Sequence, residues 1–420
     1  MAELNSLEAV LELARTATPE TVSGIVKQIY PAVAELALTE VETNQVFAAL
    51  KEGGGATLTA LRRDFTGYLT ANNLIAERDS VGTVIVKLAL ESGLEMWHDP
   101  EGNPWATLRN SGHAEHHPLK TKAIRRYLAH LYYQEHECAA HAQGVQDALM
   151  TLEAKAVFEG PEYPTFVRLA EVDGVIYLDL ANEGWQVVKV SPQGWAIMEA
   201  DDVPVRFRRP RGMSPLPVPV QGGTLTELAE LLNVSVDSRD WKLIVAWLLQ
   251  ALRGTGPYPV LVLTGGQGSG KSTAAKMLRA LLDPNVSPLR SLSRDERDLF
   301  IAAVNGWALA FDNISGLSQW ISDALCKLST GGGLSVRELF SDADETLLDA
   351  MRPVILNGIT DFVDKQDLVD RALQVRLPSI PKEDRKPEKE LWARFDDAQP
   401  RILGALLDTV YSFTIELLHS

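Results

Sequence analysis

The chain contains 420 residues and carries a formal net charge of −16 at pH 7, with 45% hydrophobic and 23% charged residues. These fractions are ordinary for a soluble globular protein, and the length predicts two or three domains. No apolar run approaches the ~20 residues of a bilayer span, and the presence of only two cysteines excludes a disulfide framework. The net charge excludes a general polyanion-binding surface, so any contact with nucleic acid must be local. The acidic N-terminus lacks the basic region of a signal peptide, and we expect a cytoplasmic protein that does not enter a membrane.

The N-terminal regions are expected to be mainly helical. Residues 1–75 place apolar residues at helical spacing, and the glycines of KEGGGAT (51–57) interrupt that pattern. Residues 76–160 combine a strand candidate, GTVIVKLAL (82–90), with long helical stretches. They form a possible DNA-binding or oligomerisation region.

The next region, residues 161–222, predicts a small β-rich module. TFVRLAEVDGVIYLDL contains two apolar runs joined by VDG, which is a hairpin signal. RRPRGMSPLPVPVQGG (208–223) is rich in proline and glycine and predicts a stiff linker. Residues 223–255 are expected to form a helical connector.

Two short segments are strongly basic. KTKAIRR contains Lys120, Lys122, Arg125 and Arg126, and RFRRPRG contains Arg206, Arg208, Arg209 and Arg211. Each segment either contacts nucleic acid or is a solvated or salt-bridged surface, and the sequence leaves both interpretations open. The histidines of GHAEHH and HECAAH lack a C-x-x-C companion, which favours packed or solvated side chains over zinc.

Residues 256–381 alternate short β-rich runs with helical segments. The runs YPVLVLT, WALAFDN, RPVILNG and LQVRLP each end in polar residues. Such alternation predicts a parallel sheet covered by helices, in which ligands collect at the carboxyl ends of the strands. A helical segment, 382–420, is expected to follow.

The segment VLVLTGGQGSGKSTAAKML matches the phosphate-loop pattern G-x-x-x-x-G-K-[ST], and the strand before it and the helix after it argue against a chance match. Its glycines let backbone N–H groups converge on phosphate oxygens, and the helix directs its positive end toward them. We expect Lys271 to contact the β- and γ-phosphates of ATP and Ser272 to bind Mg²⁺. The predicted nucleotide-binding residues are Gly265, Gly266, Gln267, Gly268, Ser269, Gly270, Lys271, Ser272 and Thr273.

A second Mg²⁺-associated residue is expected at the end of another strand. Trp307 to Phe311 predict that strand, and Asp312 lies at its tip, 312 − 271 = 41 residues after Lys271, which leaves room for one helix and one further strand. Asn313 follows where many ATPases have a second carboxylate, but an amide cannot accept a proton at neutral pH. A general base would therefore come from elsewhere, and Glu338 and Asp298 are candidates.

The strand RPVILNG ends in Asn357. An amide there would lie near the phosphate loop and Asp312, where it can sense the γ-phosphate. The alternative is a turn-forming Asn-Gly pair.

These motifs, in this order, resemble the superfamily 3 helicases, which are AAA+ ATPases of small DNA viruses, poxviruses, phages and mobile elements. The resemblance covers GGQGSGKST, ALAFDN, LSTGGGLSVRELF and RPVILNG, within about 258–380. Residues 160–260 resemble the region before the ATPase core in the phage and prophage poxvirus-type primase–helicase group. The implied fold is an α/β P-loop AAA+ core with a parallel sheet, preceded by helical and small β-rich regions.

The resemblance also implies a pore hairpin that grips DNA. It maps onto TGGGLSVRELFSDADE (330–345), in which Ser335, Arg337 and Phe340 offer hydrogen bonding, phosphate contact and base stacking. The viral relatives carry lysine or histidine near the hairpin tip, whereas this chain has Leu339 and Phe340 followed by three acids. A solvent loop with Phe340 in the core is the alternative.

A further implication is an arginine that reaches the ATP site of a neighbouring subunit. Arg371 lies 371 − 357 = 14 residues after Asn357, and Arg352 and Arg376 are alternatives. A guanidinium suits that role because it is always charged and binds phosphate oxygens in bidentate fashion. Such an arginine requires an oligomer, and the family usually forms rings of six.

The sequence therefore predicts a Mg²⁺- and ATP-dependent, ring-forming DNA helicase of a phage or mobile element that acts in DNA replication. Its partners would be single-stranded or forked DNA, further copies of itself, and a primase or other replication proteins. One alternative is an oligomeric nucleotide-dependent switch or assembly ATPase without unwinding activity. A second alternative is a small-molecule phosphotransferase, which would have no use for Arg371.

Overall fold

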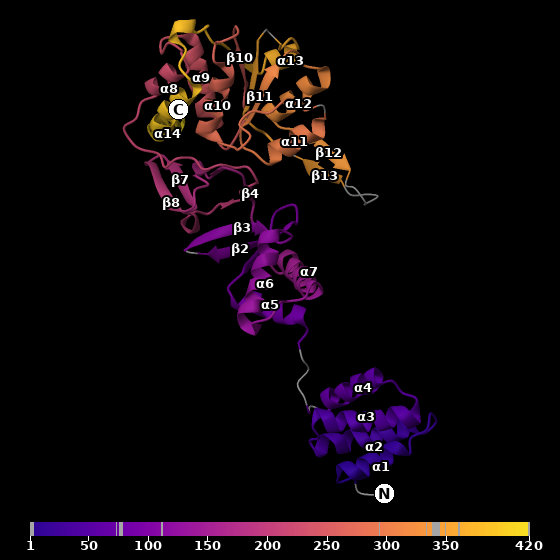
Figure 1. Ribbon diagram of the computed structural model, residues 1–420. Helices are drawn as coiled ribbons and strands as arrows, with labels where there is room; N and C mark the ends of the chain where they lie inside the picture. Colours follow the sequence, from indigo (N-terminus) through magenta and orange to yellow (C-terminus); the bar gives the residue numbers. More distant parts are fainter. Residues whose placement is uncertain are drawn as a thin grey trace. The chain divides into compact units, whose positions relative to one another are not determined.

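The computed structural model describes residues 4–72, 74, 79–110, 112–293, 295–332, 334–337, 345–348, 350–359 and 362–418. The chain divides into two compact units, residues 1–84 and residues 85–420 (Figure 1). In the described part of the chain, no helix is both long and apolar enough to cross a membrane.

The first unit is a small helical bundle. Its helices are α1 (Leu7–Arg15), α2 (Val22–Glu35), α3 (Glu40–Gly54) and α4 (Leu58–Ala71). Helix α3 begins at a capping box, in which Thr39 and Glu42 satisfy each other's backbone N–H groups. It ends at Gly55, whose φ of 71° is left-handed, so the predicted interruption in KEGGGAT is present. The core contains Ile29, Phe47 and Leu50.

The second unit begins with three helices and a three-stranded antiparallel sheet. Its elements are α5 (Val81–Glu91), β1 (Glu95–His98), β2 (Pro104–Asn110), β3 (His113–Pro118), α6 (Lys122–His136) and α7 (Ala142–Phe158). The prediction of a strand at 82–90 is wrong, because α5 occupies it. Ile85 and Ala89 are buried one helical turn apart, and the Ser80 hydroxyl caps the helix by accepting the N–H of Thr83. The four-residue spacing of buried groups outweighs the β-branched composition.

A four-stranded antiparallel meander follows. The strands of this region are β4 (Thr165–Phe166), β5 (Leu169–Val172), β6 (Val175–Asp179), β7 (Gln186–Ser191), β8 (Gly194–Glu199) and β9 (Arg206–Phe207), with a 3₁₀ turn, η1 (Ala200–Asp202), before β9. The meander has the order β5-β6-β7-β8. Its first hairpin turns at Asp173 and Gly174, both with positive φ, as a two-residue hairpin loop requires. The hairpin predicted from VDG is therefore present.

The proline-rich segment 208–223 does not behave as a linker. Leu216 is buried, and its N–H donates to the carbonyl of Leu180, while Val220 donates to Pro400. A Cβ at Gly404 would lie 1.9 Å from the carbonyl oxygen of Val220, so the segment lies directly against the C-terminal helix. The segment is therefore packed through Leu216 and through its backbone, although Val218 and Val220 remain exposed.

Helices then enclose a parallel sheet (Figure 1). The helices are α8 (Thr226–Leu231), α9 (Arg239–Ala251), α10 (Lys271–Leu282), α11 (Glu296–Val304), α12 (Gln319–Thr330), α13 (Gln366–Val369) and α14 (Glu388–Leu418), with a 3₁₀ turn, η2 (Lys382–Asp384). The sheet strands are β10 (Val260–Thr264), β11 (Leu309–Ile314), β14 (Val354–Gly358) and β15 (Ala372–Arg376). A separate two-stranded ladder is formed by β12 (Leu334–Arg337) and β13 (Glu345–Leu348).

The sheet order is β11-β14-β10-β15, and all of its pairings are parallel. Each predicted run therefore supplies one strand, and the mixed α/β class is confirmed. The further strand expected between Lys271 and Asp312 is reduced to one residue, because Arg290 alone bridges Phe311 at the sheet edge.

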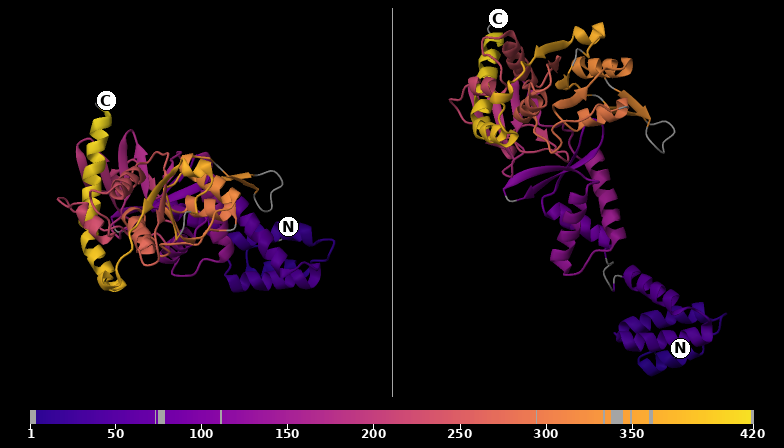
Figure 2. Two further views of the ribbon diagram at one scale, coloured as in Figure 1. Left: turned by 90° about the horizontal axis from the view of Figure 1, so that it is seen from above. Right: turned by 45° about the horizontal axis from the view of Figure 1, so that its top comes forward.

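Helix α14 joins the meander to the sheet. It lies against α8, α9, α10 and the β7–β8 hairpin (Figure 2). The Trp195 indole on β8 donates to the Asp408 carboxylate on α14 at 2.8 Å. The meander and the parallel sheet therefore share one core, which includes Leu178, Val188, Ile244, Leu278 and Leu406.

A buried ion pair connects the same two parts. The Arg168 guanidinium, fully buried before β5, donates to the Asp283 carboxylate at 3.1 Å and to the carbonyls of Asp179 and Ser214. The second Asp283 oxygen accepts the N–H groups of Trp307 and Ala308, just before β11. Asp283 is also the C-cap of α10.

We predict that Arg168→Met lowers the free energy of unfolding by about 3–5 kcal/mol, because it leaves the Asp283 carboxylate buried without its cation. Lys155→Met, which removes one partner of the surface pair Lys155–Glu159, is the control and is expected to cost less than about 1 kcal/mol. Urea denaturation of the full chain measures both. Equal effects in the two variants would contradict the importance of the buried pair.

A second buried polar network lies between β2, β3 and β9. The Thr107 hydroxyl oxygen accepts the Trp97 indole N–H at 3.0 Å and an Arg206 N–H at 2.8 Å, so its own proton is free to donate to His116 Nδ1 at 2.9 Å. That arrangement requires a neutral imidazole. Burial, with Arg206 and other nearby cations, lowers the pKa of His116 from 6.5 to about 3.

We predict a loss of stability as pH falls from 6.5, because the unfolded chain then binds a proton at residue 116 that the folded chain does not. Between pH 6.5 and 5 this group alone costs about 2 kcal/mol. His116→Gln retains an acceptor for Thr107 and removes the titration. Urea unfolding at pH 7 and pH 5 should therefore show a pH dependence smaller by about that amount in His116→Gln, and an unchanged dependence would refute the assignment.

Candidate functional site

The candidate site begins in the glycine-rich loop between β10 and α10. Gly265, Gly268 and Gly270 have φ values of 150°, 79° and 77°, which residues with a Cβ rarely adopt. A Cβ at Gly265 would lie 2.6 Å from the carbonyl oxygen of Leu377, and one at Gly268 would lie 2.3 Å from an Arg385 nitrogen. Backbone strain and close packing therefore both require glycine, and the loop exposes N–H groups just ahead of the α10 amino end.

Lys271 is the first residue of α10, and its side chain is buried. Its ammonium donates to the carbonyls of Gly265 and Gly266, each at 3.0 Å. Burial lowers the pKa of Lys271, and the nearby Asp312 carboxylate opposes that shift. The ammonium charge of Lys271 therefore lies within the loop, where a bound anion would contact it together with the loop N–H groups.

Three predicted residues come together beside the loop. The Ser272 hydroxyl donates to the Asp312 carboxylate at 3.0 Å, and the Asn357 amide donates to the Ser272 oxygen at 3.3 Å. Because β14 lies between β10 and β11, the carboxyl ends of the three strands place Ser272, Asp312 and Asn357 side by side. Asn357 is buried on β14 and its side chain points to Ser272. This placement agrees with an amide near the phosphate loop and Asp312, and it does not agree with a turn-forming Asn-Gly pair.

Asn313 lies at an irregularity of β11. The register shifts between Phe311 and Ile314, and Asn313 has a φ of 58°. Its side chain is exposed, and its N–H donates to the Asp312 carboxylate at 2.7 Å. The bulge therefore directs a main-chain donor at Asp312 while the amide side chain faces outward.

Neither candidate for the general base is joined to this cluster by a contact among the described residues. Asp298 is exposed in the first turn of α11 and accepts the Ser293 hydroxyl at 3.1 Å. Glu338 lies outside the described residues.

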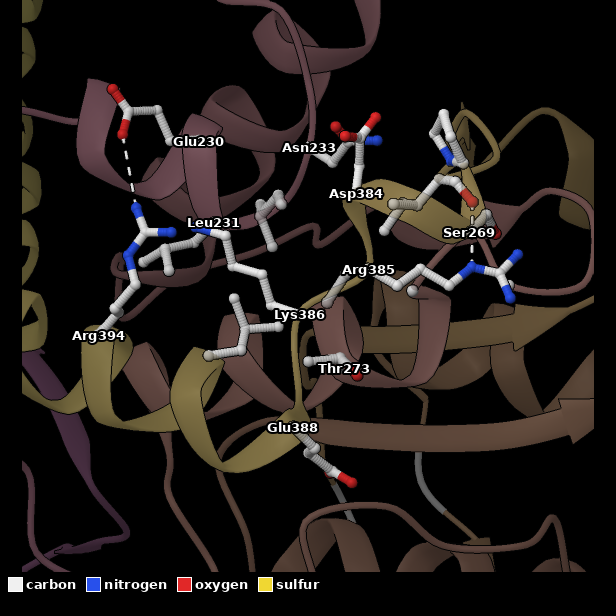
Figure 3. Close-up of a pocket in the computed structure, with 17 residues that line it drawn as sticks. Glu230, Leu231, Asn233, Ser269, Thr273, Asp384, Arg385, Lys386, Glu388 and Arg394 are labelled. Carbon is white, nitrogen blue, oxygen red and sulfur yellow. Dashed lines mark hydrogen bonds and ion pairs between the residues drawn. The ribbon is translucent and has the colours of Figure 1, made fainter.

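A pocket of about 390 Å³ opens on the other side of the loop (Figure 3). One wall is the turn after α8, with Leu231, Leu232 and Asn233, and the floor is the loop with Thr273. The opposite wall comes from residues 380–394. Across one end of the pocket, Glu230 and Arg394 approach to 3.8 Å, and Arg385 lies at the other end beside the loop (Figure 3).

The wall 380–394 was not predicted as part of the site. Ile380 donates its N–H to the carbonyl of Gly268 at 3.3 Å, and the Arg385 guanidinium donates to the carbonyl of Ile380 at 3.0 Å. No motif in the sequence marks this wall. Its only signal is its position directly after the last strand of the sheet.

Arg371 does not join the cluster. It precedes β15, and its carbonyl accepts the N–H of Val260, at the amino end of β10. The carboxyl end of β10, which leads into the loop and Ser272, lies about 13 Å from Val260 along the strand. The half-buried Arg371 side chain donates to the carbonyl of Asp367 at 2.6 Å.

The two alternative arginines have different surroundings. The Arg352 guanidinium donates to the carbonyls of Ala303 and Gly306 and lies 5.2 Å from the Trp307 ring, so its role is structural. Arg376 lies opposite Thr264, and its side chain is exposed.

The segment predicted to form the pore hairpin contains a two-stranded β-ladder. β12 and β13 pair antiparallel, from Leu334 with Leu348 to Arg337 with Glu345. Ser335 and Arg337 therefore lie on β12, and Phe340 lies outside the described residues.

The comparisons with known proteins concern mainly this part of the chain. Residues 224–415 match the family model described as "Actinomycete integrative conjugative element replication protein". This range is less than half of the 420 residues, but it contains the parallel sheet, the loop and the pocket. The chain thus contains a segment similar to a replication protein of mobile elements.

Among solved structures, "The A form apo structure of NrS-1 C terminal region-CTR" is similar at 14% identity, over 77% of this chain and 68% of that chain, with a TM-score of 0.45. "The apo structure of NrS-1 C terminal region (305-718)" is similar at 13% identity, over 82% of this chain and 76% of that chain, with a TM-score of 0.41. No curated protein sequence matches the chain.

Proposed function

We propose that the chain is an ATP-hydrolysing motor of the AAA+ type that acts as a homo-oligomeric ring of six subunits on DNA during replication of a mobile genetic element. The observation that carries this proposal is the Ser272–Asp312–Asn357 cluster at the carboxyl ends of three adjacent parallel strands. The sequence resemblance to superfamily 3 helicases and the match of residues 224–415 to a mobile-element replication family support it independently.

The residues of the loop fit a nucleoside triphosphate bound with Mg²⁺. The glycines leave no room for side chains where phosphates would approach, and the N–H groups of the loop supply donors. Ser272 and Asp312 present adjacent oxygen atoms, which are the donors that Mg²⁺ prefers. A bound Mg²⁺ would neutralise charge between the β- and γ-phosphates. Lys271 would exchange its two carbonyl partners for phosphate oxygens.

The remaining residues have distinct roles. The Asn357 amide, held beside Ser272, would report whether a γ-phosphate is present. The pocket is continuous with the loop, and Leu232 and Ile380 give each of its two walls an apolar side chain, which suits a nucleobase. The Asn313 amide can orient a water molecule but not deprotonate it.

Arg371 would act on the site of the next subunit. Its backbone lies at the opposite end of β10 from the loop. We therefore propose that it serves a neighbour that packs against the amino ends of the strands. A ring would then place a guanidinium from one subunit at the phosphates of another.

DNA contact within the ring would come from Ser335 and Arg337 of the β12–β13 hairpin, and from Phe340, which follows β12 in the sequence. We propose single-stranded or forked DNA as the substrate.

One observation favours a second function, an oligomeric switch or assembly ATPase without unwinding, because Asn313 stands where motors carry a catalytic carboxylate. A strand-displacement assay on forked DNA separates the two functions, since only the motor unwinds the fork.

We predict that single-stranded DNA stimulates ATP turnover and that Lys271→Ala lowers turnover by about 100-fold or more, because the phosphates lose their charged partner. Lys242→Ala, which removes an exposed cation from α9, is the matched control and should retain wild-type turnover. Turnover that is indifferent to both DNA and RNA over a range of salt would exclude the motor.

We also predict that Lys271→Ala and Arg371→Ala complement each other. Each variant alone should be inactive, because every shared site then lacks one component. In rings assembled from an equal mixture, about one quarter of the sites pair an intact Lys271 with an intact Arg371 of the neighbour, so turnover should return to about one quarter of the wild-type rate. No recovery in rings shown to contain both variants would place Arg371 outside the shared site.

A further inference from the structure

The two basic segments differ in how their side chains are used. In RFRRPRG, Arg206 donates to Glu95 and Thr107, Arg208 to the carbonyl of Val304, and Arg209 to Asp179. The Arg206 and Arg209 guanidiniums also lie over the rings of Tyr163 and Trp185, at 3.9 and 3.6 Å. These three cations are therefore occupied inside the fold and are not available to a partner.

In KTKAIRR, by contrast, the cations are exposed on α6. Lys122, Arg125 and Arg126 all face solvent. Among the described residues, no ion pair or side-chain hydrogen bond joins any of the three to another group. Lys120, which precedes the helix, approaches Glu153 only to 3.9 Å and is 74% exposed.

The phase of the helix places these groups on one face. Ile124 and Leu128 are buried against the rest of the unit, and Lys122, Arg126, His130 and Tyr133 recur at three- or four-residue intervals on the opposite side. Residues 122–134 contain no acidic side chain. In a chain with a net charge of −16, a whole helix face without a carboxylate is a distinct local positive surface.

An unused aromatic side chain lies on the same face. Tyr127 donates its hydroxyl to Ser92 at 2.9 Å, and the Tyr132 ring packs on His136 at 4.6 Å. Tyr133 is 57% exposed, and within the described part of the chain its side chain has no ring or hydrogen-bond partner. Unpaired cations with an exposed tyrosine are the side-chain set that contacts nucleic-acid backbones and bases.

We propose that the exposed face of α6, formed by Lys122, Arg125, Arg126, His130 and Tyr133, is a binding site for duplex DNA, separate from the ATP-dependent site. Successive residues of a helix diverge by about 100°, so Arg125 and Arg126 extend to opposite sides of the Lys122 line. A helix about 10–12 Å wide fits the ~12 Å major groove, where such flanking guanidiniums reach the phosphates of both walls. Tyr133, about 16 Å along the helix from Lys122, extends the contact in the same direction.

The test measures binding of the full chain to a labelled duplex without nucleotide or Mg²⁺, so that it is independent of ATP hydrolysis. The variant is Lys122→Ala/Arg125→Ala/Arg126→Ala. Its control is Lys27→Ala/Lys51→Ala/Arg63→Ala, which removes three exposed cations from the first unit and changes the net charge equally. Thermal unfolding midpoints equal to the wild type establish that both variants fold.

We expect the α6 variant to bind duplex DNA at least about tenfold more weakly at about 100 mM salt, and the control to bind as the wild type does. The slope of log K against log salt should fall in magnitude by about 2.7, because three phosphate contacts are lost. Equal weakening in both variants would show an effect of net charge alone and would overturn the proposal. A loss confined to single-stranded DNA of the same sequence would also overturn it, in favour of a strand-binding surface.

Discussion

The Arg168–Asp283 ion pair is the contact on which the geometry of the candidate site depends. Asp283 caps the far end of α10, the helix that begins with Lys271 and Ser272. The same carboxylate accepts the N–H groups of Trp307 and Ala308, just before β11, the strand that carries Asp312. One buried carboxylate therefore holds the carboxyl end of α10, which begins with Lys271 and Ser272, and the segment leading into β11, which carries Asp312. Because the pair is fully buried, each partner requires the other, and neither element can shift along its axis without exposing an unpaired charge.

Arg168 extends this constraint to the meander. Its other two hydrogen bonds go to the ends of β6 and to the proline-rich segment, and α14 covers the same junction through Trp195 and Asp408. The meander is therefore part of the scaffold of the candidate site and not an appended module. At the opposite end of the sheet, the Arg371 guanidinium donates to the carbonyl of Asp367, and among the described residues no ion pair holds it. In the role proposed above, it would exchange this carbonyl for phosphate oxygens bound to a neighbouring subunit.

The sequence predicted those parts of the site that follow from local pattern. The four strand runs, the loop and the polar strand ends are local signals, and parallel pairing then brings Ser272, Asp312 and Asn357 together. The errors arose where contacts with residues distant in the sequence determine the local structure. GTVIVKLAL forms a helix because Ile85 and Ala89 are buried by partners elsewhere in the chain, and 208–223 is packed because α14 lies beside it. The pocket wall at 380–394 carries no motif, because its contribution is shape and backbone contact with Gly268.

The same limit applies to charge. KTKAIRR and RFRRPRG have similar compositions, and nothing within either segment distinguishes them. The difference lies in Glu95 and Asp179, which are distant in the sequence but adjacent to RFRRPRG in the fold. Cations that pair with carboxylates of the fold stabilise the protein and are not available to a partner, whereas the unpaired cations on α6 are stabilised only by water. Counterions are released when cations bind the phosphates of DNA, and this release favours binding. The unpaired cations of α6 can therefore contribute to DNA binding, whereas cations already paired within the fold cannot.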